Sequence, residues 1–292
     1  MGLFSGLEHV VRDGEPLAPY TWLRLGGPAE FFAEPTSVEE LASLVRRCHE
    51  RAIPARVLGG GSNVLIPDDG VRGLVVNMAA AAFCQISVRG NTLAAGGGAK
   101  LGHVVSTAVR EGLAGLEQLV GIPGTIGGAL HGNSGANGAD IGQWTQCASV
   151  MTRTGDVLVH KRDELRFSYR QSSLDEPVIL AADFVLDEDD PRELTKRMQK
   201  VWIVKKAHQP QGNVNAGFIF KDVGGISAAS LIEQAGLKSA RMGEALVCPQ
   251  NANFIVANTG ASSQQVLNLI DLLREGVAER LGVALETAIE IW

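Results

Sequence analysis

The segment from Gly121 to Gly138 constrains this chain more than any other, because glycine recurs through it and large side chains are few. It reads Gly-Ile-Pro-Gly-Thr-Ile-Gly-Gly-Ala-Leu-His-Gly-Asn-Ser-Gly-Ala-Asn-Gly. Glycine permits positive φ angles and close approach to the main chain, at a conformational cost in folding that another interaction must offset. The backbone itself is therefore the available chemistry of this segment.

A second glycine-rich loop, Leu58-Gly-Gly-Gly-Ser-Asn63, precedes it. The residues before and after this loop predict short strands at Ala55–Leu58 and Val71–Asn77. Successive main-chain amides can converge on a phosphate as a concave nest, so two such loops in one half of the chain indicate a ligand with a diphosphate. For either loop alone, tight turns in a β-rich domain are the alternative interpretation.

Neither loop has the spacing of the common nucleotide-binding motifs. The Rossmann pattern fails because Val64 stands where a third glycine should follow Gly59 and Gly61, and the glycines of the later loop are spaced by threes. The Walker A pattern is absent, since no Gly-Lys-Ser/Thr closes either loop.

Length and composition predict a globular protein with one large or two medium domains, since 45% of the 292 residues are hydrophobic. A net charge of −6 disfavours nucleic acid as a partner, and Lys205-Lys206 is the one basic cluster of the sequence that stands out. The N-terminal sequence lacks a basic start and no apolar run approaches a membrane span, which predicts a cytoplasmic protein. The cysteines and histidines show no disulfide or metal-ligand spacing.

Hydrophobic periodicity predicts an α+β chain with a junction near residue 190. Ser37-Val-Glu-Glu40 is a capping box before a helix that Pro54 closes, and Gly112 ends a second helix from about Leu101. Short strands are expected near 74–76, 84–88 and 92–95, and β-like segments between 148 and 186.

The C-terminal part predicts more helix. Asp190 caps a helix that begins at Pro191, with a buried stripe of Leu194, Met198, Val201 and Trp202. A short helix follows near 228–235. The last helix stops at Gly282 and buries Val266, Ile270, Leu273, Val277 and Leu281, and residues 283–291 alternate as a closing strand.

Several segments, read in order, resemble the UDP-N-acetylenolpyruvoylglucosamine reductase (UDP-N-acetylmuramate dehydrogenase) family of flavoenzymes of peptidoglycan synthesis. They are Arg24-Leu-Gly-Gly-Pro-Ala29, Leu58–Asn63, Gly121–Ala129, Asn133–Gly138, Tyr169-Arg-Gln-Ser172, Gln209-Pro210, Phe220-Lys221, Leu231–Lys238 and Asn253-Phe254. The resemblance runs from about Pro19 to the C-terminus. Each motif alone is weak, but their order and spacing together are specific.

The resemblance implies an FAD-binding domain of the p-cresol methylhydroxylase/vanillyl-alcohol oxidase type at residues 1–190. A smaller C-terminal α+β substrate-binding domain is then expected at 191–292. The lack of a long insertion before the C-terminal portion is similar to the shorter, type II branch. The family's roles in cell wall biogenesis, cell shape and cell division are implied with it.

The family's mechanism implies noncovalent FAD and NADPH as cofactors and a UDP-sugar as substrate. NADPH gives hydride to flavin N5, and the enolpyruvyl ether then takes hydride from the reduced flavin, so negative charge develops on the substrate carboxylate. Arg170 of the Tyr-Arg-x-Ser motif would stabilise this enolate, because its planar fork matches a carboxylate. A surface ion pair with Asp163 or Glu164 is the alternative for Arg170, and His131 is expected to be packed or solvated rather than flavin-linked.

The predicted site residues follow from the loops and the resemblance. Cofactor binding is expected at Leu58, Gly59, Gly60, Gly61, Ser62, Asn63, Gly121, Pro123, Gly124, Thr125, Gly127, Gly128, Asn133, Gly135 and Ala136. Substrate binding is expected at Tyr169, Arg170, Lys221 and Asn253. No metal is expected.

Two positions depart from the family pattern where it places catalytic acids. Ala216-Gly-Phe-Ile-Phe-Lys-Asp-Val223 puts Phe218 where the proton donor to substrate C2 belongs, and Leu285-Glu-Thr-Ala-Ile289 puts Ala288 where the closing glutamate belongs. Cys248, Gln250 and Asn251 also replace family residues before Asn253. All of these changes lie in the C-terminal half.

Glu290 is the candidate catalytic substitute, because it lies two residues beyond Ala288 and on the same face of a strand. Glu286 lies two residues before Ala288. A two-residue step is roughly 6.5 to 7 Å, so the substrate or the strand must shift, and a surface glutamate is the alternative. Cys248 replaces a donor if the fold brings it beside the flavin.

Three functions remain open from the sequence. The first is a working FAD- and NADPH-dependent reductase with an impaired second half-reaction, its proton supplied by water or another side chain. The second is a catalytically impaired paralogue that binds FAD and a UDP-sugar as a regulatory or partner protein. The third keeps the fold but acts as a flavin oxidase or dehydrogenase on another substrate. The oligomeric state stays open.

Overall fold

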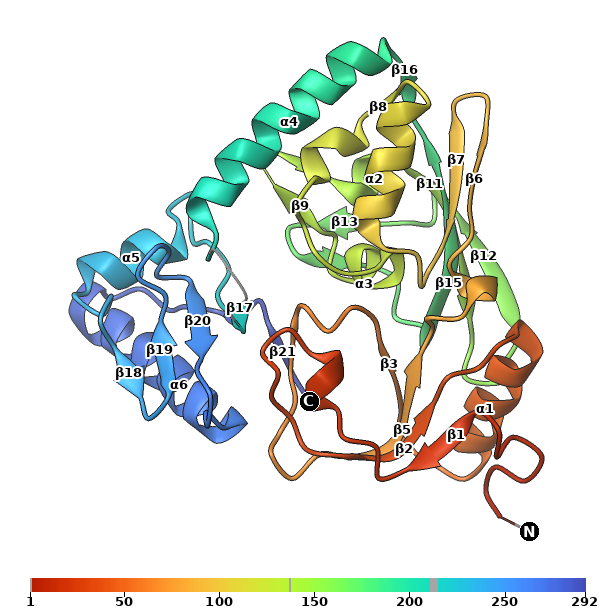
Figure 1. The fold of residues 1–292 in the computed structure, drawn as a ribbon, viewed down its shortest axis with the longest axis horizontal. Helices are drawn as coiled ribbons and strands as arrows, with labels where there is room; N and C mark the ends of the chain where they lie inside the picture. Colours follow the sequence, from red (N-terminus) through yellow and green to blue (C-terminus); the bar gives the residue numbers. More distant parts are fainter. Residues whose placement is uncertain (1, 137, 211–214) are drawn as a thin grey trace. The chain divides into compact units, whose positions relative to one another are not determined.

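The computed structural model describes residues 2–136, 138–210 and 215–292, and these residues divide into two compact units. Unit 1 comprises Met1–Glu15, Ala29–Gly60 and Arg72–Val204, and unit 2 comprises Pro16–Pro28, Gly61–Val71 and Lys205–Trp292. Figure 1 traces the elements in chain order. No helix of the described residues is both long and apolar enough to cross a membrane.

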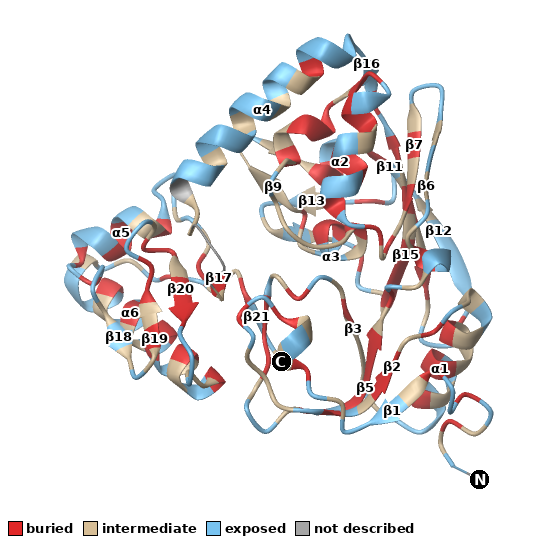
Figure 2. Ribbon diagram, in the orientation of Figure 1, coloured by how far each residue is buried: buried red, intermediate tan, exposed pale blue. Residues whose placement is uncertain are grey.

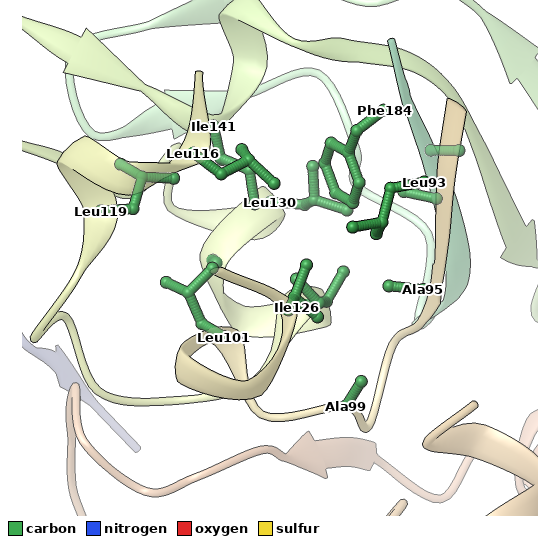
Figure 3. Close-up of a cluster of buried hydrophobic side chains, with 14 of the residues drawn as sticks. Leu93, Ala95, Ala99, Leu101, Leu116, Leu119, Ile126, Leu130, Ile141 and Phe184 are labelled. Carbon is green, nitrogen blue, oxygen red and sulfur yellow. The ribbon is translucent and has the colours of Figure 1, made fainter. Parts of the chain in front are cut away.

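Unit 1 contains an antiparallel sheet with the strand order β12-β11-β15-β7-β6. The strands are β6 (Ile86–Arg89), β7 (Thr92–Gly96), β11 (Thr145–Met151), β12 (Val157–Lys161) and β15 (Val178–Val185). The helices that bury side chains with this sheet are α2 (Leu101–Arg110), α3 (Ile126–His131), η3 (Leu116–Leu119) and η4 (Ile141–Gln143). Figure 3 shows Leu130 of α3 beside Leu93 and Phe184 of the sheet in this core.

A second sheet of unit 1 has the order β1-β2-β5-β3 and packs against α1 (Val38–Glu50). Its strands are β1 (Val11–Asp13), β2 (Ala29–Ala33), β3 (Ala55–Leu58) and β5 (Val71–Asn77). Ser37 caps α1 by accepting a hydrogen bond from the Glu40 N–H. The Glu40 carboxylate accepts from the Thr36 N–H at 2.7 Å, which lowers the pKa of Glu40 to about 2.

Short strand pairs and single-turn helices complete unit 1 and connect its sheets. The pairs are β8 (Leu113–Ala114) with β16 (Asp187–Glu188), β9 (Gly135–Ala136) with β10 (Ala139–Asp140), and β13 (Phe167–Ser168) with β14 (Gln171–Ser172). A further 3₁₀ turn is η2 (Ala81–Phe83).

Unit 2 is built on the antiparallel order β17-β20-β19-β18 with two helices, α5 (Ala228–Gln234) and α6 (Ser263–Leu281), that share its core. Its strands are β17 (Ala216–Phe218), β18 (Arg241–Met242), β19 (Ala245–Val247) and β20 (Phe254–Ala257). The segments from the N-terminal half contribute η1 (Ala18–Tyr20) and β4 (Val64–Leu65), and β4 pairs in parallel with β21 (Glu290–Ile291).

The structure confirms most predicted elements. Strands β3 and β5 have the predicted bounds, Gly112 and Gly282 follow α2 and α6 at positive φ, and α5 lies where expected. Asp190 caps α4 (Pro191–His208) by accepting from the Arg192 N–H at 2.7 Å. The predicted boundary at 190/191 coincides with the start of α4, whereas the compact units change at 204/205.

Two predictions about elements were wrong. Trp202 was expected in the buried stripe of α4 but is 45% exposed, because burial in this helix centres on its first turns, where Leu194 is fully buried. Figure 2 shows α4 largely exposed along its length. The predicted closing strand is also shorter: of residues 283–292, all described, Glu290–Ile291 form β21, and the main chain before it bonds to residues 219–221 instead.

Candidate functional site

The two glycine-rich loops lie directly against each other in unit 1. A Cβ added at Gly60 would lie 2.8 Å from the Gly124 Cα, and one added at Gly59 would lie 2.6 Å from the Thr125 Oγ1. Gly124 also has a φ of 115°, a backbone conformation that residues with a side chain rarely adopt. Glycine is therefore required at this junction, and the loops predicted to share one ligand do meet.

Main-chain donors gather where these loops touch. Among the described residues, the N–H groups of Gly59, Gly60, Gly124 and Thr125 have no protein acceptor. The next amides are used inside the protein, because the Gly127 N–H donates to the Gly97 carbonyl at 2.8 Å. A close-packed set of unbonded amides fits the phosphate oxygens of a dinucleotide such as FAD.

The rest of the first loop belongs to unit 2. A Cβ at Gly61 would lie 2.0 Å from the Tyr20 carbonyl oxygen, so glycine is required here too. The Asn63 side chain donates to the Ala288 carbonyl at 2.9 Å, and the Asn63 carbonyl accepts from the Glu290 N–H at 3.0 Å. Asn63, predicted to bind cofactor, therefore also fixes the C-terminal segment.

The later part of the Gly121–Gly138 segment folds as α3 and a small hairpin. Thr125 caps α3, and its Oγ1 accepts from the Gly128 N–H. Gly135–Ala136 form β9, while Asn137 lies outside the described residues. Asn133 is 3% exposed, with its side-chain amide bonded within unit 1, so its predicted cofactor contact remains a prediction for its main chain.

Arg170 occupies the two-residue turn of the β13–β14 hairpin together with Tyr169. Its φ of 59° is in the left-handed region, which costs a non-glycine residue of order 1–3 kcal/mol. The Tyr169 side chain is exposed, and the Arg170 guanidinium lies 5.9 Å from its ring centroid. Glycine or asparagine would be favoured at this turn, and the predicted contact of Arg170 with the substrate stays a prediction.

In unit 2, the two departures from the family pattern lie on neighbouring segments. Phe218 of β17 pairs with Phe254 of β20, with ring centroids 5.5 Å apart and edge to face. The Ala288 N–H donates to the carbonyl of Ile219, the next residue after Phe218, at 2.7 Å. The backbone thus brings together the two positions at which the family pattern places acids.

The predicted substrate residues of unit 2 surround the same backbone. Asn253 is 2% exposed and its side chain bonds both main-chain groups of Phe220, each at 2.8 Å. These two hydrogen bonds hold the segment that carries Lys221. The Lys221 Nζ lies 3.3 Å from a Glu286 carboxylate oxygen.

The candidate substitutes for the missing acids have different environments. The Glu290 side chain is exposed, whereas its N–H is used in the contact with Asn63. Cys248 is 1% exposed, and its Sγ contacts the Gln250 Oε1 at 3.5 Å.

The sequence did not predict the role of Asp68, which joins the segment after the first glycine-rich loop to helix α6. Asp68 caps α6 by accepting from the N–H groups of Ser263 and Gln264, at 2.8 and 3.0 Å. The Pro-Asp-Asp-Gly sequence there predicts a turn, but its contact with a helix nearly two hundred residues later carries no local signal.

Domain families match both parts of the chain. A family described as the UDP-N-acetylenolpyruvoylglucosamine reductase C-terminal domain matches residues 209–292, and one described as an FAD binding domain matches residues 29–160. UDP-N-acetylenolpyruvoylglucosamine reductase from Rhodopirellula baltica is 40% identical over 98% of this chain and 94% of its own length. This chain belongs to the UDP-N-acetylenolpyruvoylglucosamine reductase family.

Further relatives support this family membership. UDP-N-acetylenolpyruvoylglucosamine reductase 2 from Symbiobacterium thermophilum is 40% identical over 97% of this chain and 92% of its own length. The crystal structure of the reductase from Thermus caldophilus matches with a TM-score of 0.82 and 34% identity, covering 97% of this chain and 98% of that one. The reductase fold therefore extends over 97% of this chain.

The fold prediction is confirmed as well. The chain has an FAD-binding domain of the p-cresol methylhydroxylase/vanillyl-alcohol oxidase type followed by the C-terminal reductase domain. 6-Hydroxy-D-nicotine oxidase from Arthrobacter nicotinovorans shares this fold with a TM-score of 0.56 at 14% identity. At that identity the likeness concerns fold alone.

Proposed function

We propose that this chain reduces UDP-N-acetylglucosamine enolpyruvate to UDP-N-acetylmuramate, using bound FAD and NADPH, in the synthesis of peptidoglycan precursors. Whole-length similarity to reductases of that name supports the reaction. The observation that carries the proposal in this chain is the junction of Gly60 and Gly124, where unbonded amides gather. The reaction would take place in the cytoplasm and serve cell shape and division through the cell wall.

The cofactor fits the residues present. The amides of Gly59, Gly60, Gly124 and Thr125 would bind the diphosphate of FAD without a covalent link. When bound, FAD supplies two-electron transfer between NADPH and the enolpyruvyl ether. The protein contributes binding, orientation and stabilisation of charge on the substrate.

Arg170 is the residue that would stabilise the negative charge on the substrate. Negative charge develops on the substrate carboxylate as the ether is reduced, and a guanidinium binds a carboxylate through two parallel N–H donors. Tyr169, Lys221 and Asn253 would complete the substrate contacts, with Asn253 acting through its hold on Phe220 and hence on Lys221.

Proton delivery to substrate C2 must differ from the family pattern, because Phe218 and Ala288 have no proton to give. We propose that water supplies it in this chain, with Glu290 and Cys248 as the side chains to test. Phe218 and Ala288 also favour the second candidate, a paralogue that binds FAD and the UDP-sugar with little turnover. Whole-length similarity to reductases favours the enzyme.

An anaerobic experiment separates these functions. The purified protein is mixed with NADPH while the visible flavin absorbance is followed, and UDP-N-acetylglucosamine enolpyruvate is then added. A reductase bleaches with NADPH and recovers its colour with the enolpyruvyl compound, but not with UDP-N-acetylglucosamine as the matched control. Bleaching without recovery would support the paralogue, and a protein that binds no flavin would contradict both functions.

A further inference from the structure

Asn133 joins two segments of unit 1 through a buried side chain. It follows α3, is 3% exposed and has a φ of 41°. Its Nδ2 donates to the Ser168 carbonyl at 2.9 Å, and its Oδ1 accepts from the Gly142 N–H at 3.1 Å. Both ends of this amide are thus bonded within the protein, one of them to strand β13 of the Arg170 hairpin.

A second bond holds the other strand of the same hairpin. The Ser172 Oγ of β14 donates to the His131 carbonyl, at the end of α3, at 3.0 Å. A Cβ at Gly142 would lie 2.3 Å from the Phe167 ring, so the main chain of η4 packs tightly on the side chain of Phe167 in β13. Both strands are therefore fixed to the segment that follows the cofactor loop.

The hairpin leaves Arg170 little freedom. Ser168 and Gln171 are paired, so Tyr169 and Arg170 form the turn between two fixed strands. The left-handed φ of Arg170 is unfavourable for an arginine and persists where the surrounding contacts impose it. The bonds from Asn133 and Ser172 are contacts of this kind.

The opposite end of α3 lies in the cofactor loop. Thr125, whose amide is among the unbonded donors, caps the helix, and six residues later α3 ends at His131. One short rigid element therefore connects the cofactor loop to the hairpin that carries Arg170.

We propose that Asn133 is a positioning residue that holds Arg170 in register with the cofactor loop for the substrate carboxylate. This inference rests on the proposed role of Arg170. Asn133 acts through Arg170 and need not touch the substrate, so its effect on substrate binding depends on the arginine being present.

The test is a double-mutant cycle on the FAD-loaded full chain. Asn133→Gly removes both side-chain bonds and tolerates the positive φ of this position, which separates the lost bonds from backbone strain. The dissociation constant of UDP-N-acetylglucosamine enolpyruvate is measured by titration calorimetry for the wild type, Asn133→Gly, Arg170→Ala and the double variant. We expect Asn133→Gly to weaken binding about tenfold, because a displaced Arg170 would lose much of the roughly 10- to 150-fold that its hydrogen bonds to a carboxylate contribute.

The decisive comparison is non-additivity. In the Arg170→Ala background, Asn133→Gly should weaken binding less than about twofold, because the group through which it acts is gone. Equal weakening in both backgrounds, or wild-type affinity in Asn133→Gly, would overturn the proposal.

Limited trypsin digestion gives a readout independent of substrate. Cleavage after Arg170 should accelerate in Asn133→Gly relative to cleavage after Arg153, which lies in another turn of unit 1. Val104→Ala, a core substitution in α2, serves as the control for general destabilisation and should not change this ratio. An unchanged ratio in Asn133→Gly would refute the positioning of the hairpin. If the wild type does not bind the enolpyruvyl compound, the proposed function fails, and the digestion alone decides the role of Asn133.

Discussion

At the scale of single residues, the loops proposed to bind the cofactor keep their glycines, whereas Phe218 and Ala288 stand where the family pattern has acids. A Cβ at Gly60 would clash with the main chain of Gly124, one at Gly59 would clash with the Thr125 Oγ1, and Gly124 has a φ of 115°. Phe218, by contrast, packs edge to face against Phe254, and Ala288 donates its N–H to the Ile219 carbonyl, and neither side chain has a proton to give. The proposed binding of the flavin and the proposed delivery of the proton therefore rest on different residues.

The first prediction concerns Arg170. Arg170→Ala should weaken binding of the enolpyruvyl substrate by roughly 10- to 150-fold, because hydrogen bonds to charged groups contribute about 1.5–3 kcal/mol. FAD content and melting temperature should stay nearly unchanged. Arg170→Lys keeps the charge but loses the two-donor fork, so it should recover little of the affinity. Substrate titration decides, and equal affinity in the alanine variant and the wild type would contradict the assignment.

The second prediction concerns Phe218 and Ala288. The double substitution Phe218→Ser with Ala288→Glu should speed flavin reoxidation by the enolpyruvyl substrate by about 10² or more, since a general acid typically contributes about 10²–10⁴ in rate. Flavin reduction by NADPH needs positioning but no protein proton donor, so its rate should change much less. Stopped-flow measurement of both steps checks this. A wild type that already turns over at about 10 s⁻¹ would show that another residue supplies the proton.

The third prediction concerns the junction of the loops. Gly60→Ala should lower FAD content, because its Cβ must displace the main chain of Gly124. Gly102→Ala is the matched control: its Cβ would meet nothing within 4 Å, and alanine favours a helix by about 0.5–1 kcal/mol. Flavin released by acid precipitation and the melting temperature are measured for both. Full FAD content in Gly60→Ala would argue against the proposed binding at this junction.

At the scale of elements, a capping residue from the N-terminal half of the chain starts the longest helix of unit 2. Asp68 accepts from the first two N–H groups of α6, while Ser262 accepts from the Gln265 N–H. The Ser263 hydroxyl, fully buried, donates to the Ile66 carbonyl at 2.6 Å. The start of α6 is thus held by the short segment that also carries β4.

The fourth prediction follows from this cap. Asp68→Ala should destabilise the protein by about 0.5–2 kcal/mol, as loss of an N-cap side chain does, because it removes the acceptor of the first two N–H groups of α6. Asp69→Ala makes the same change of charge at the next residue, which is exposed, and should stay within about 0.5 kcal/mol of the wild type. Denaturant unfolding measures both, and similar losses for the two variants would point to charge rather than capping.

The elements that sequence predicts well here have local causes. Ser37 before an apolar periodicity places the start of α1, and Gly282 places the end of α6. The glycine content of the two loops predicted a shared diphosphate ligand, and their direct contact was seen in the structure. The burial of Trp202 and the length of the closing strand were mispredicted because both depend on which distant segments pack or pair with them. The hydrogen bonds of Asn133 and Asp68 were missed because their partners are distant in sequence, and no local pattern marks such contacts.

At the scale of the whole molecule, the fold separates into two units with cores of their own. The core of unit 1 lies between its sheets and helices α1, α2 and α3, and that of unit 2 around α5 and α6. The loop amides proposed to bind the FAD diphosphate, those of Gly59, Gly60, Gly124 and Thr125, lie in unit 1. Cofactor binding should therefore stabilise that unit more than the other.

The fifth prediction tests this by calorimetry. FAD at about a hundred times its dissociation constant should add about 2.7 kcal/mol to the stability of unit 1, raising its transition by roughly 5–10 °C over the flavin-free protein. Riboflavin, which lacks the diphosphate, should give a much smaller shift at the same concentration. An equal shift with riboflavin would mean that the isoalloxazine ring, and not the loop amides, dominates binding.

Unit 2 is made of three separate segments of the chain, and this affects when it can fold during synthesis. Its pieces Pro16–Pro28 and Gly61–Val71 leave the ribosome early, whereas Ser263, which bonds to Ile66, and β21, which pairs with β4, are made last. The early segments can therefore pack against these partners only after nearly the whole chain has been synthesised. A fragment that begins at Lys205 would therefore lack Ile66 and β4, and its unit 2 would be incomplete.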